Sequence, residues 1–199
     1  MSLSSYSDIQ NAISTWLNRQ DLDAKIPDFI TLCEADLQRN VIHEMGMSNR
    51  DVMTSYNGYI TLPDDFNGVI SFKGTQRIKF VTLNQFDSYD NPSAGDPSEY
   101  TLSGGRAYLG PNPPVDGSQF TLTYKVKIDL LRFGPNWILE NHPDAYLYGS
   151  LIHAEPYIVE DERVPLWKSY YDKIIRDIEL DGIRQAGGGY LQLQSTGPR

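Results

Sequence analysis

The spacing of hydrophobic residues changes twice along this chain, and this change constrains the fold more than any other feature. Toward both ends, apolar residues recur every three or four positions, as they do on one face of an α-helix. From about Asp51 to about residue 130 they alternate with polar residues, which is typical of β-strands with one buried face. The sequence therefore predicts an α+β chain, mainly α, in which a block of strands is inserted between two groups of helices.

The clearest strand is predicted at residues 120–128. Its hydrophobic positions are Phe120, Leu122, Tyr124, Val126 and Ile128, and Thr or Lys occupies every position between them. Shorter β-type runs precede this strand, separated by turn sequences such as the Asn-Gly pair at 57–58. A short helix is predicted at Val81–Asp87. We expect the block to fold as a small antiparallel sheet or sandwich.

Two helices are predicted before the strands. Ser7 is the expected N-cap of the first helix, with Trp16 on its buried face. The second helix is predicted from Ala24 to Val41 and buries Phe29 and Cys33. Cys33 is the only cysteine of the chain. No disulfide can form within the chain, and we expect Cys33 to act as a small buried hydrophobic residue.

Two further helices are predicted after the strands. Asn141 is the expected N-cap of the first, because Pro143 is tolerated in a first helical turn and an Asn side chain can accept from a free backbone N–H. The last helix is predicted to open at Glu160 and Asp161 and to run for about 25 residues. One of its faces carries Leu166, Tyr170, Ile174, Ile178 and Gly182, and Trp167, Tyr171 and Ile175 widen that face.

The chain is predicted to divide into four segments. Residues 1–50 and 133–186 each supply a pair of helices, and the two pairs pack as a four-helix-type bundle. Residues 51–132 form the inserted β domain, and residues 187–199 form an extended C-terminal tail. The predicted core of the bundle consists of Trp16, Phe29, Leu147, Leu151, Trp167, Tyr170 and Ile174.

The C-terminal tail is predicted to begin at a glycine hinge formed by Gly187, Gly188 and Gly189. The next residues have a strand-like alternation of apolar and polar side chains: Tyr190, Leu191, Gln192, Leu193 and Gln194. A lone terminal strand has no obvious partner in its own domain. It could be disordered in the free protein, or it could add to the edge of a sheet on another chain.

The charge of the chain argues against sequence-independent binding to the DNA backbone. The formal net charge is −9, and the sequence contains no basic cluster that could neutralise phosphates. A negatively charged wall around passing DNA remains compatible, because it would repel the strand and let it slide. Met1–Ser7 has neither a basic nor an apolar region, so no signal peptide is expected, and no apolar run approaches the ~20 residues of a membrane span.

Residues of the kinds found in active sites are present, but their spacing does not indicate catalysis. His43, His142 and His153 lack the spacing of metal ligands, and His153 with Glu155 does not form a zinc-protease motif. The acidic clusters at 64–65 and 160–162 are expected to be solvated or to cap helices. The glycines at 187–189 lack the Lys and Ser or Thr of a phosphate-binding loop. We therefore predict no catalytic residue, no metal site and no cofactor.

Four segments, in this order, resemble the head-tail adaptor proteins of tailed bacteriophages. The first is AISTWLNRQDLDAKIPDFITLCEADLQRNV (Ala12–Val41), which resembles their opening helix pair. The next two resemble their β insertion: YITLPDDF (Tyr59–Phe66) and EYTLSGGRAYLGPNPP (Glu99–Pro114). The last is NWILENHPDAYLYGSLIHAEPYIVEDERVPLWKSYYD (Asn136–Asp172), which resembles their C-terminal helical signature.

This resemblance implies a structural virion protein rather than an enzyme. Adaptors of this kind, also termed head completion or connector proteins and similar to tail tubular protein A of short-tailed phages, form a ring of twelve subunits beneath the portal. The ring closes the DNA-filled head and offers a platform for the tail or nozzle protein. The tail at 187–199 would reach the portal and anchor through Leu191 and Leu193. Expected partners are thus the portal, the tail or nozzle protein, further copies of the chain and passing double-stranded DNA, with no membrane.

The expected location is the head-tail interface of the virion, and the host cytoplasm during assembly. The alternative interpretation is a β-rich receptor- or glycan-binding module, supported by the Trp and Tyr content and by the central strands. The helices that frame the strands argue against it, because a compact lectin-type sandwich does not need them.

Overall fold

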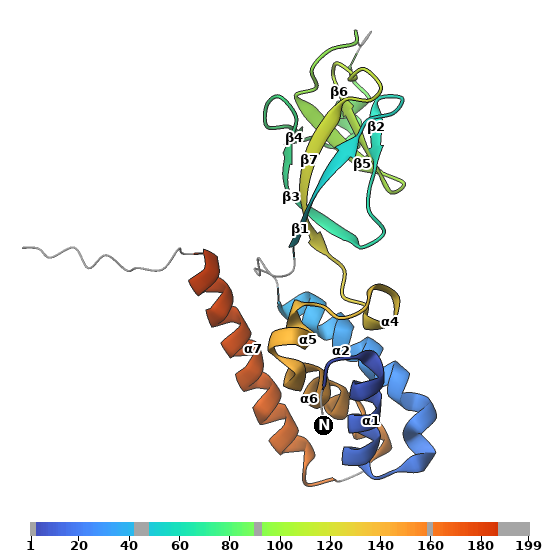
Figure 1. Cartoon of the computed structure of the whole chain (residues 1–199), viewed down its shortest axis with the longest axis vertical. Coiled ribbons are helices and arrows are strands. Elements are labelled where there is room, and N and C mark those ends of the chain that lie inside the picture. Colours follow the sequence, from blue (N-terminus) through green and yellow to red (C-terminus); the bar gives the residue numbers. More distant parts are fainter. Residues whose placement is uncertain (1–2, 42–47, 90–92, 159–160, 187–199) are drawn as a thin grey trace, which may run out of the picture. The chain divides into compact units, whose positions relative to one another are not determined.

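The computed structural model of the chain describes residues 3–41, 48–89, 93–158 and 161–186. The chain folds into two compact units (Figure 1), one formed by Met1–Met47 with Ile128–Arg199 and the other by Ser48–Lys127. The first unit is helical and the second is built of strands. The predicted α+β class with antiparallel sheets is confirmed. The predicted boundaries at 51 and 132 differ from these limits by a few residues.

The helical unit is organised around one central helix, α6, which packs against α7, α2, α1 and α5. This helix is buried on most sides, since Ala145, Tyr146, Leu147, Gly149, Ser150 and Leu151 are all buried. The helices are α1 (Tyr6–Leu17), α2 (Ile26–Asn40), α4 (Leu130–Phe133), α5 (Trp137–Asn141), α6 (Pro143–His153) and α7 (Val164–Ala186), with 3₁₀ helices η1 (Gln20–Lys25) and η3 (Glu155–Tyr157).

The N-caps differ from the predicted ones at two helices. Ser5, not Ser7, caps α1, and its side chain accepts from the backbone N–H of Asp8. Asn141 does not cap α6, because it is the last residue of α5 and its amide donates to the backbone oxygen of Trp137. The capping asparagine of this region is Asn136, whose side chain accepts from the N–H of Leu139 at 3.1 Å. The sequence prediction missed α5, which precedes α6 directly.

The buried face of α7 is rotated from the predicted one. Its buried residues include Trp167, Tyr171, Ile174 and Ile178, whereas Leu166 and Tyr170 are 49% and 43% exposed. Adjacent positions are about 100° apart around a helix, so the helix turns Tyr171 rather than Tyr170 toward the core. The prediction that Tyr170 belongs to the core is therefore wrong.

Trp16 is the other predicted core residue that lies at the surface, with 42% of its area exposed. The face of α1 that points inward instead consists of Ile9, Ala12, Ile13 and Leu17. The remaining predicted core residues are buried: Phe29, Leu147, Leu151, Trp167 and Ile174. Cys33 is buried as well.

The β unit consists of two sheets. One has the strand order β1-β7-β3, and the other has the order β2-β6-β5-β4, in which only the β4–β5 pair is parallel. The elements are β1 (Ser48–Thr54), β2 (Tyr59–Thr61), β3 (Phe66–Lys73), β4 (Lys79–Phe80), α3 (Leu83–Phe86), β5 (Glu99–Ser103), β6 (Arg106–Gly110) and β7 (Gln119–Val126). The predicted short helix at Val81–Asp87 corresponds to α3, which begins with a capping box between Thr82 and Gln85.

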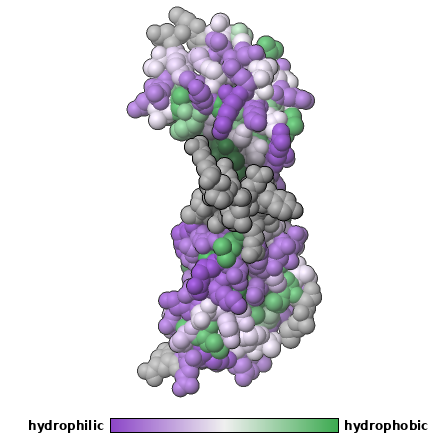
Figure 2. Space-filling model, turned by 90° about the vertical axis from the view of Figure 1, so that its left-hand side faces the viewer, coloured by the Kyte–Doolittle hydropathy of each residue, from purple (hydrophilic) through white to green (hydrophobic). Residues whose placement is uncertain are grey.

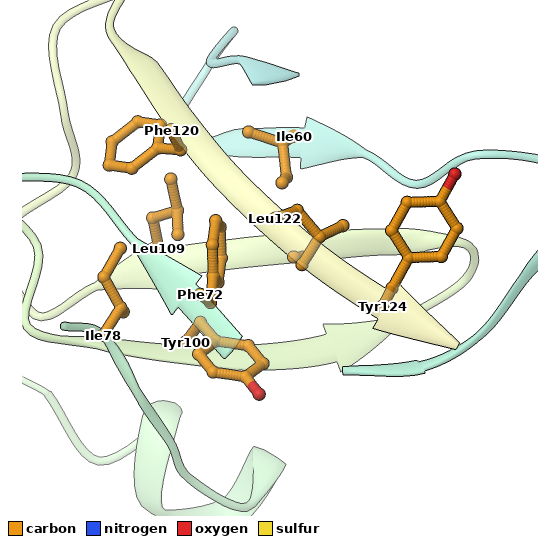
Figure 3. Close-up of a cluster of buried hydrophobic side chains, with 9 residues drawn as sticks. Ile60, Phe72, Ile78, Tyr100, Leu109, Phe120, Leu122 and Tyr124 are labelled. Carbon is orange, nitrogen blue, oxygen red and sulfur yellow. The ribbon is translucent and has the colours of Figure 1, made fainter. Parts of the chain in front are cut away.

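Hairpin connections join the two sheets at both margins. Tyr56 bridges to Tyr59 between β1 and β2, and Lys73 bridges to Arg77 between β3 and β4. The space between the sheets holds a hydrophobic cluster (Figure 3) to which β7 contributes Phe120, Leu122 and Tyr124 from one face. Those are alternate residues of the strand predicted at 120–128, and the other sheet supplies Ile60, Tyr100, Ala107 and Leu109 to the same cluster. The strict alternation thus marks the strand that fills the sandwich core.

Strand β1 was not predicted. Its burial pattern shows no alternation. Asn49 to Val52 and Thr54 are exposed, and Ser48 and Met53 are half-buried. The strand forms because β7 pairs with it along its whole length, from Ser48 with Lys125 to Thr54 with Gln119. A strand held by backbone pairing rather than by a buried face leaves no period-two signal in the sequence.

Candidate assembly surfaces

Two side chains of α2 hold the segment that leads into α4. Gln38 Oε1 accepts a hydrogen bond from the backbone N–H of Ile128 at 2.7 Å, and Glu34 Oε1 accepts one from Leu130 N–H at 2.7 Å. Burial raises the pKa of the Glu34 carboxyl, and the nearby charge of Asp129 raises it further. These contacts satisfy backbone donors at the position where the chain re-enters the helical unit.

Helices α2, α6 and α7 approach one another closely at Gly149. A Cβ atom at this position would lie 2.4 Å from Cys33 Sγ and 2.9 Å from the Tyr171 ring. The Tyr171 hydroxyl donates to Asp36 on α2 at 2.7 Å. Burial raises the pKa of the Tyr171 hydroxyl and that of the Cys33 thiol, so both groups are neutral. Gly149 therefore sets the separation of the three helices.

One flank of α7 carries a row of aromatic and aliphatic side chains at the surface. The Trp16 and Tyr148 rings meet edge to face with centroids 5.7 Å apart, and the Tyr148 and Tyr170 rings are 5.2 Å apart. Leu166, one turn before Tyr170 on α7, is also exposed. We call these four residues the aromatic flank. Large apolar side chains gathered at a surface are a common feature of protein interfaces.

The opposite flank of α7 borders a groove of about 410 Å³ between α2, α6 and α7. We call it the α2–α7 groove. Its apolar lining includes Gly149, Ile152 and Ile175, and its polar lining includes Asp36, Asn40, His153, Lys168 and Asp172. Burial lowers the pKa of His153, which favours the neutral imidazole. The groove thus offers an apolar floor with polar groups around it.

The start of α7 is fixed by Arg163. Its guanidinium pairs with Asp161 at 2.6 Å and donates from Nη1 to the backbone oxygen of Trp16 at 2.9 Å. The same group lies 5.0 Å from the centroid of the Trp167 ring. These contacts join the end of α1 to the beginning of α7, and so they help to place the aromatic flank.

The β unit has an aromatic surface of its own. Tyr59 and Tyr108 pack with ring centroids 5.7 Å apart, and the Arg106 guanidinium lies 4.4 Å from the Tyr59 ring. Phe86 and Tyr89 lie beside Tyr108 in the lining of a cavity of about 340 Å³. On the face shown in Figure 2, most of the surface is hydrophilic, with isolated hydrophobic patches.

The negative charge of the chain belongs almost entirely to the helical unit. The residues of the β unit, 48–127, include seven Lys and Arg against eight Asp and Glu, a net charge of −1. The residues of the helical unit include ten Lys and Arg against eighteen Asp and Glu, a net charge of −8. Any polyanion that passes the helical unit would therefore be repelled.

Among the described residues, the histidines and the acidic clusters singled out in the sequence lie apart from one another. His142 precedes α6 and His153 ends it, so the helix separates them by about 16 Å at 1.5 Å per residue. Asp65 accepts from the Tyr124 hydroxyl at 3.1 Å, and Asp161 is paired with Arg163. The described residues contain no group of three or more His, Cys, Asp or Glu side chains placed to hold a metal ion. His43 and Glu160 lie outside the described residues.

A protein-family model described as SU10 adaptor protein matches residues 4–193, almost the whole chain and both structural units. The chain belongs to the SU10 adaptor protein family. A search of curated proteins gives no significant match.

Membership in this family makes the chain a structural adaptor protein of phages, which is not a class of enzyme. An adaptor assembles with other phage head and tail proteins and is located in the virion. Among the helices of the described residues, none combines the length and hydrophobicity needed to cross a bilayer.

The predicted site residues of the tail and its hinge, 187–194, lie outside the described residues. The aromatic flank and the α2–α7 groove were missed by sequence reasoning, which assigned Trp16 and Tyr170 to the core. A signal was present in α7. Its apolar residues form two adjacent stripes, one through Leu166 and Tyr170 and the other through Trp167 and Tyr171. Together these stripes are wider than one buried face can accommodate.

Proposed function

We propose that this adaptor forms a closed ring beneath the portal, closes the DNA-filled head and provides the platform for the tail or nozzle. In this proposal the ring contains twelve copies. The C-terminal tail reaches the portal, with Leu191 and Leu193 as its anchoring side chains and Gly187 to Gly189 as its hinge. The subunits assemble in the host cytoplasm and remain at the head-tail interface of the virion.

The observation that carries this proposal is the family match over residues 4–193. It includes the strand unit as well as both groups of helices, so it concerns the whole arrangement rather than one helix pair. The match also extends into the segment predicted to bind the portal. This supports a role for Tyr190 to Leu193 that belongs to the family rather than to this chain alone.

The charge of the helical unit provides independent support. A ring that surrounds passing DNA functions best if it does not bind the phosphates, because bound DNA would not slide. A net charge of −8 on the helical unit meets that requirement. The β unit is nearly neutral and carries exposed aromatic groups, which suits contact with another protein better than contact with DNA.

The test is co-sedimentation of the purified full chain with purified portal rings of the same phage. We expect the chain to sediment with the portal as a complex of fixed stoichiometry, and electron microscopy of that complex should show a second ring. A folded chain that stays in the supernatant at every portal concentration would contradict the portal role. A screen of receptors and glycans against the β unit would then test the binding-module alternative.

A further inference from the structure

A cavity of the β unit is lined by the end of α3, by β6 and by the turn between β1 and β2. Its volume is about 340 Å³, within the range of pockets that take a small ligand. Phe86 and Tyr89 line it from the side of α3, and Tyr108 lines it from β6. Pro111 and Pro113 complete an apolar wall. We call this space the β-unit cavity.

The aromatic walls of the β-unit cavity are held in place by contacts within the unit. The Phe86 ring lies directly on the backbone of β6, where a Cβ atom at Gly110 would be 2.8 Å from it. The Tyr89 hydroxyl donates to the Glu99 carboxylate on β5. The cavity therefore exists before any ligand arrives, and binding does not have to order its walls.

The lining of the cavity is negatively charged. Among the described residues that border it, Asp87 is the only one with a charged side chain. Asp87 is exposed, and its carboxylate makes no hydrogen bond or ion pair with another described residue. Asn57 adds a neutral amide. This lining opposes a phosphate or another anion and favours a cation.

The aromatic rings favour the same kind of ligand. The face of a Tyr or Phe ring is the negative part of its quadrupole and attracts cations. The same sheet already contains one such contact, because the Arg106 guanidinium lies 4.4 Å from the centroid of the Tyr59 ring, which packs beside Tyr108 at 5.7 Å. Arg106 does not line the cavity. The cavity thus combines aromatic rings with an unpaired carboxylate, the two groups that a stacked cation requires.

A planar guanidinium suits this combination better than an ammonium group does. It stacks on an aromatic ring and at the same time presents N–H groups in its own plane to a carboxylate. An ammonium is a compact and strongly hydrated charge. Arg is also enriched at protein interfaces, whereas Lys is depleted there. The chemistry of the cavity therefore selects an arginine side chain of another protein.

We propose that the β-unit cavity binds an arginine side chain presented by a partner protein. The guanidinium lies against the rings of Phe86 and Tyr108 and donates to the Asp87 carboxylate. This inference goes beyond the proposed ring and does not depend on it, since every residue of the site belongs to one β unit.

The site can be tested by NMR on the full chain with N-acetyl-arginine amide, which supplies the side chain alone. Titration at constant ionic strength should shift the backbone amide signals of Asn57, Asp87 and Leu109 saturably, with a millimolar Kd. N-acetyl-citrulline amide is the matched ligand, because it has nearly the same shape without the charge. We expect it to bind at least about fivefold more weakly.

Two variants separate the role of Asp87 from a general effect of charge. Asp87→Asn keeps the shape of the side chain and removes its charge, so it should weaken arginine binding about three- to fivefold, the effect of a partly exposed ion pair. It should leave the binding of the citrulline ligand unchanged. Asp64→Asn removes an exposed carboxylate elsewhere in the β unit and should leave arginine binding unchanged.

Several results would overturn the proposal. These are the absence of saturable shifts in the lining amides, equal binding of the arginine and citrulline ligands, and equal weakening by Asp87→Asn and Asp64→Asn. Saturable shifts with N-acetylglucosamine but not with arginine would assign the cavity to a glycan and would overturn the proposal as well. The titration contains no portal, so its failure leaves the proposed function standing, and failure of co-sedimentation leaves this site standing.

Discussion

At the scale of single residues, Gly149 occupies a position of the helical unit where an added Cβ atom would meet its neighbours at 2.4 Å. It lies in α6 opposite Cys33 of α2 and Tyr171 of α7, and the absence of a side chain lets the three helices meet. In an exposed helix, replacing Gly by Ala stabilises by roughly 0.5–1 kcal/mol. At Gly149 the close contacts predict that Ala would destabilise the fold instead.

We expect Gly149→Ala to lower the free energy of unfolding by about 1–3 kcal/mol, because the new methyl group would lie 2.4 Å from Cys33 Sγ. Urea denaturation followed by circular dichroism measures the change. Ser169→Ala, at an exposed position of α7, is the control and should be nearly neutral. An unchanged or increased stability of Gly149→Ala would mean that the helices do not pack this tightly.

The two tryptophans Trp167 and Trp16 provide a matched pair. Trp167 is 2% exposed and Trp16 is 42% exposed. Trp167→Ala should cost roughly 3–5 kcal/mol, because a large buried ring leaves a cavity. Trp16→Ala should cost clearly less, because much of its ring is already in water and only its partial burial and its contact with Tyr148 are lost. Equal shifts in melting temperature would contradict the burial of one ring and the exposure of the other.

At the scale of elements, the beginning of α7 depends on an ion pair that acid should break. Hydrogen bonds from Arg163 lower the pKa of Asp161 from 3.8 to about 2. Because the folded pKa lies below the unfolded value, the stabilisation is complete above about pH 4 and is lost as the pH falls toward 2. The Arg163 side chain is 48% exposed, so we expect at most about 1 kcal/mol.

The measurement compares wild type with Asp161→Asn in urea unfolding from pH 6 down to pH 2. The stability difference should be constant near neutral pH and should shrink toward zero at the acid end, because all other carboxylates titrate in both proteins. A difference that stays constant throughout would show that the pair does not form in solution.

The Tyr124 hydroxyl is one of the side-chain groups that connect strand β1 to the rest of the β unit. Tyr124 of β7 donates to Asp51 of β1 at 2.9 Å and contacts Asp65 at 3.1 Å. Burial is the main cause of the raised pKa of Tyr124, and its two carboxylate acceptors raise it further, so the hydroxyl keeps its proton. The ring fills the sandwich core while its hydroxyl satisfies the acidic groups at the edge of the core.

We therefore expect Tyr124→Phe to lower stability by about 0.5–1.5 kcal/mol, since a hydrogen bond to the exposed Asp51 carboxylate is lost while the ring remains. Tyr56→Phe is the matched control, because Tyr56 is 60% exposed. Amide hydrogen exchange should show faster exchange along β1 in Tyr124→Phe. Unchanged protection of β1 would mean that pairing with β7 alone holds the strand.

At the scale of the whole molecule, folding and assembly should be separable. Removing Tyr190–Arg199 deletes the proposed portal-binding segment without touching the described core. We expect the truncated chain to keep its melting temperature and to lose co-sedimentation with portal rings. Binding at full strength by the truncated chain would contradict the role of the tail. A matched variant, Leu191→Ser with Leu193→Ser, tests whether the two aliphatic side chains supply the affinity.

Periodicity was sufficient to predict the class of the fold and most of its elements. The alternation at 120–128 arises because a strand with one buried face places every second side chain in the core. In the structure, Phe120, Leu122 and Tyr124 from this alternation fill the sandwich core. The helices at both ends are likewise predicted from the spacing of their apolar residues. These signals are local, because each arises from the geometry of a single element. The order of the segments also carried the resemblance to phage head-tail adaptors, and the family match confirms it at the level of the phage adaptor family.

Tertiary structure alone decided the features that depend on partners. β1 exists because β7 pairs with it, although its own residues are mostly exposed. Whether α7 buries Tyr170 or Tyr171 depends on where Gly149 and Asp36 lie, and those residues are far away in sequence. Because α7 buries Tyr171, Tyr170 lies at the surface in the aromatic flank, and the α2–α7 groove lies on the other side of the helix. Spacing along one helix reports that an apolar stripe exists, but only packing against neighbours determines which part of it remains exposed for assembly.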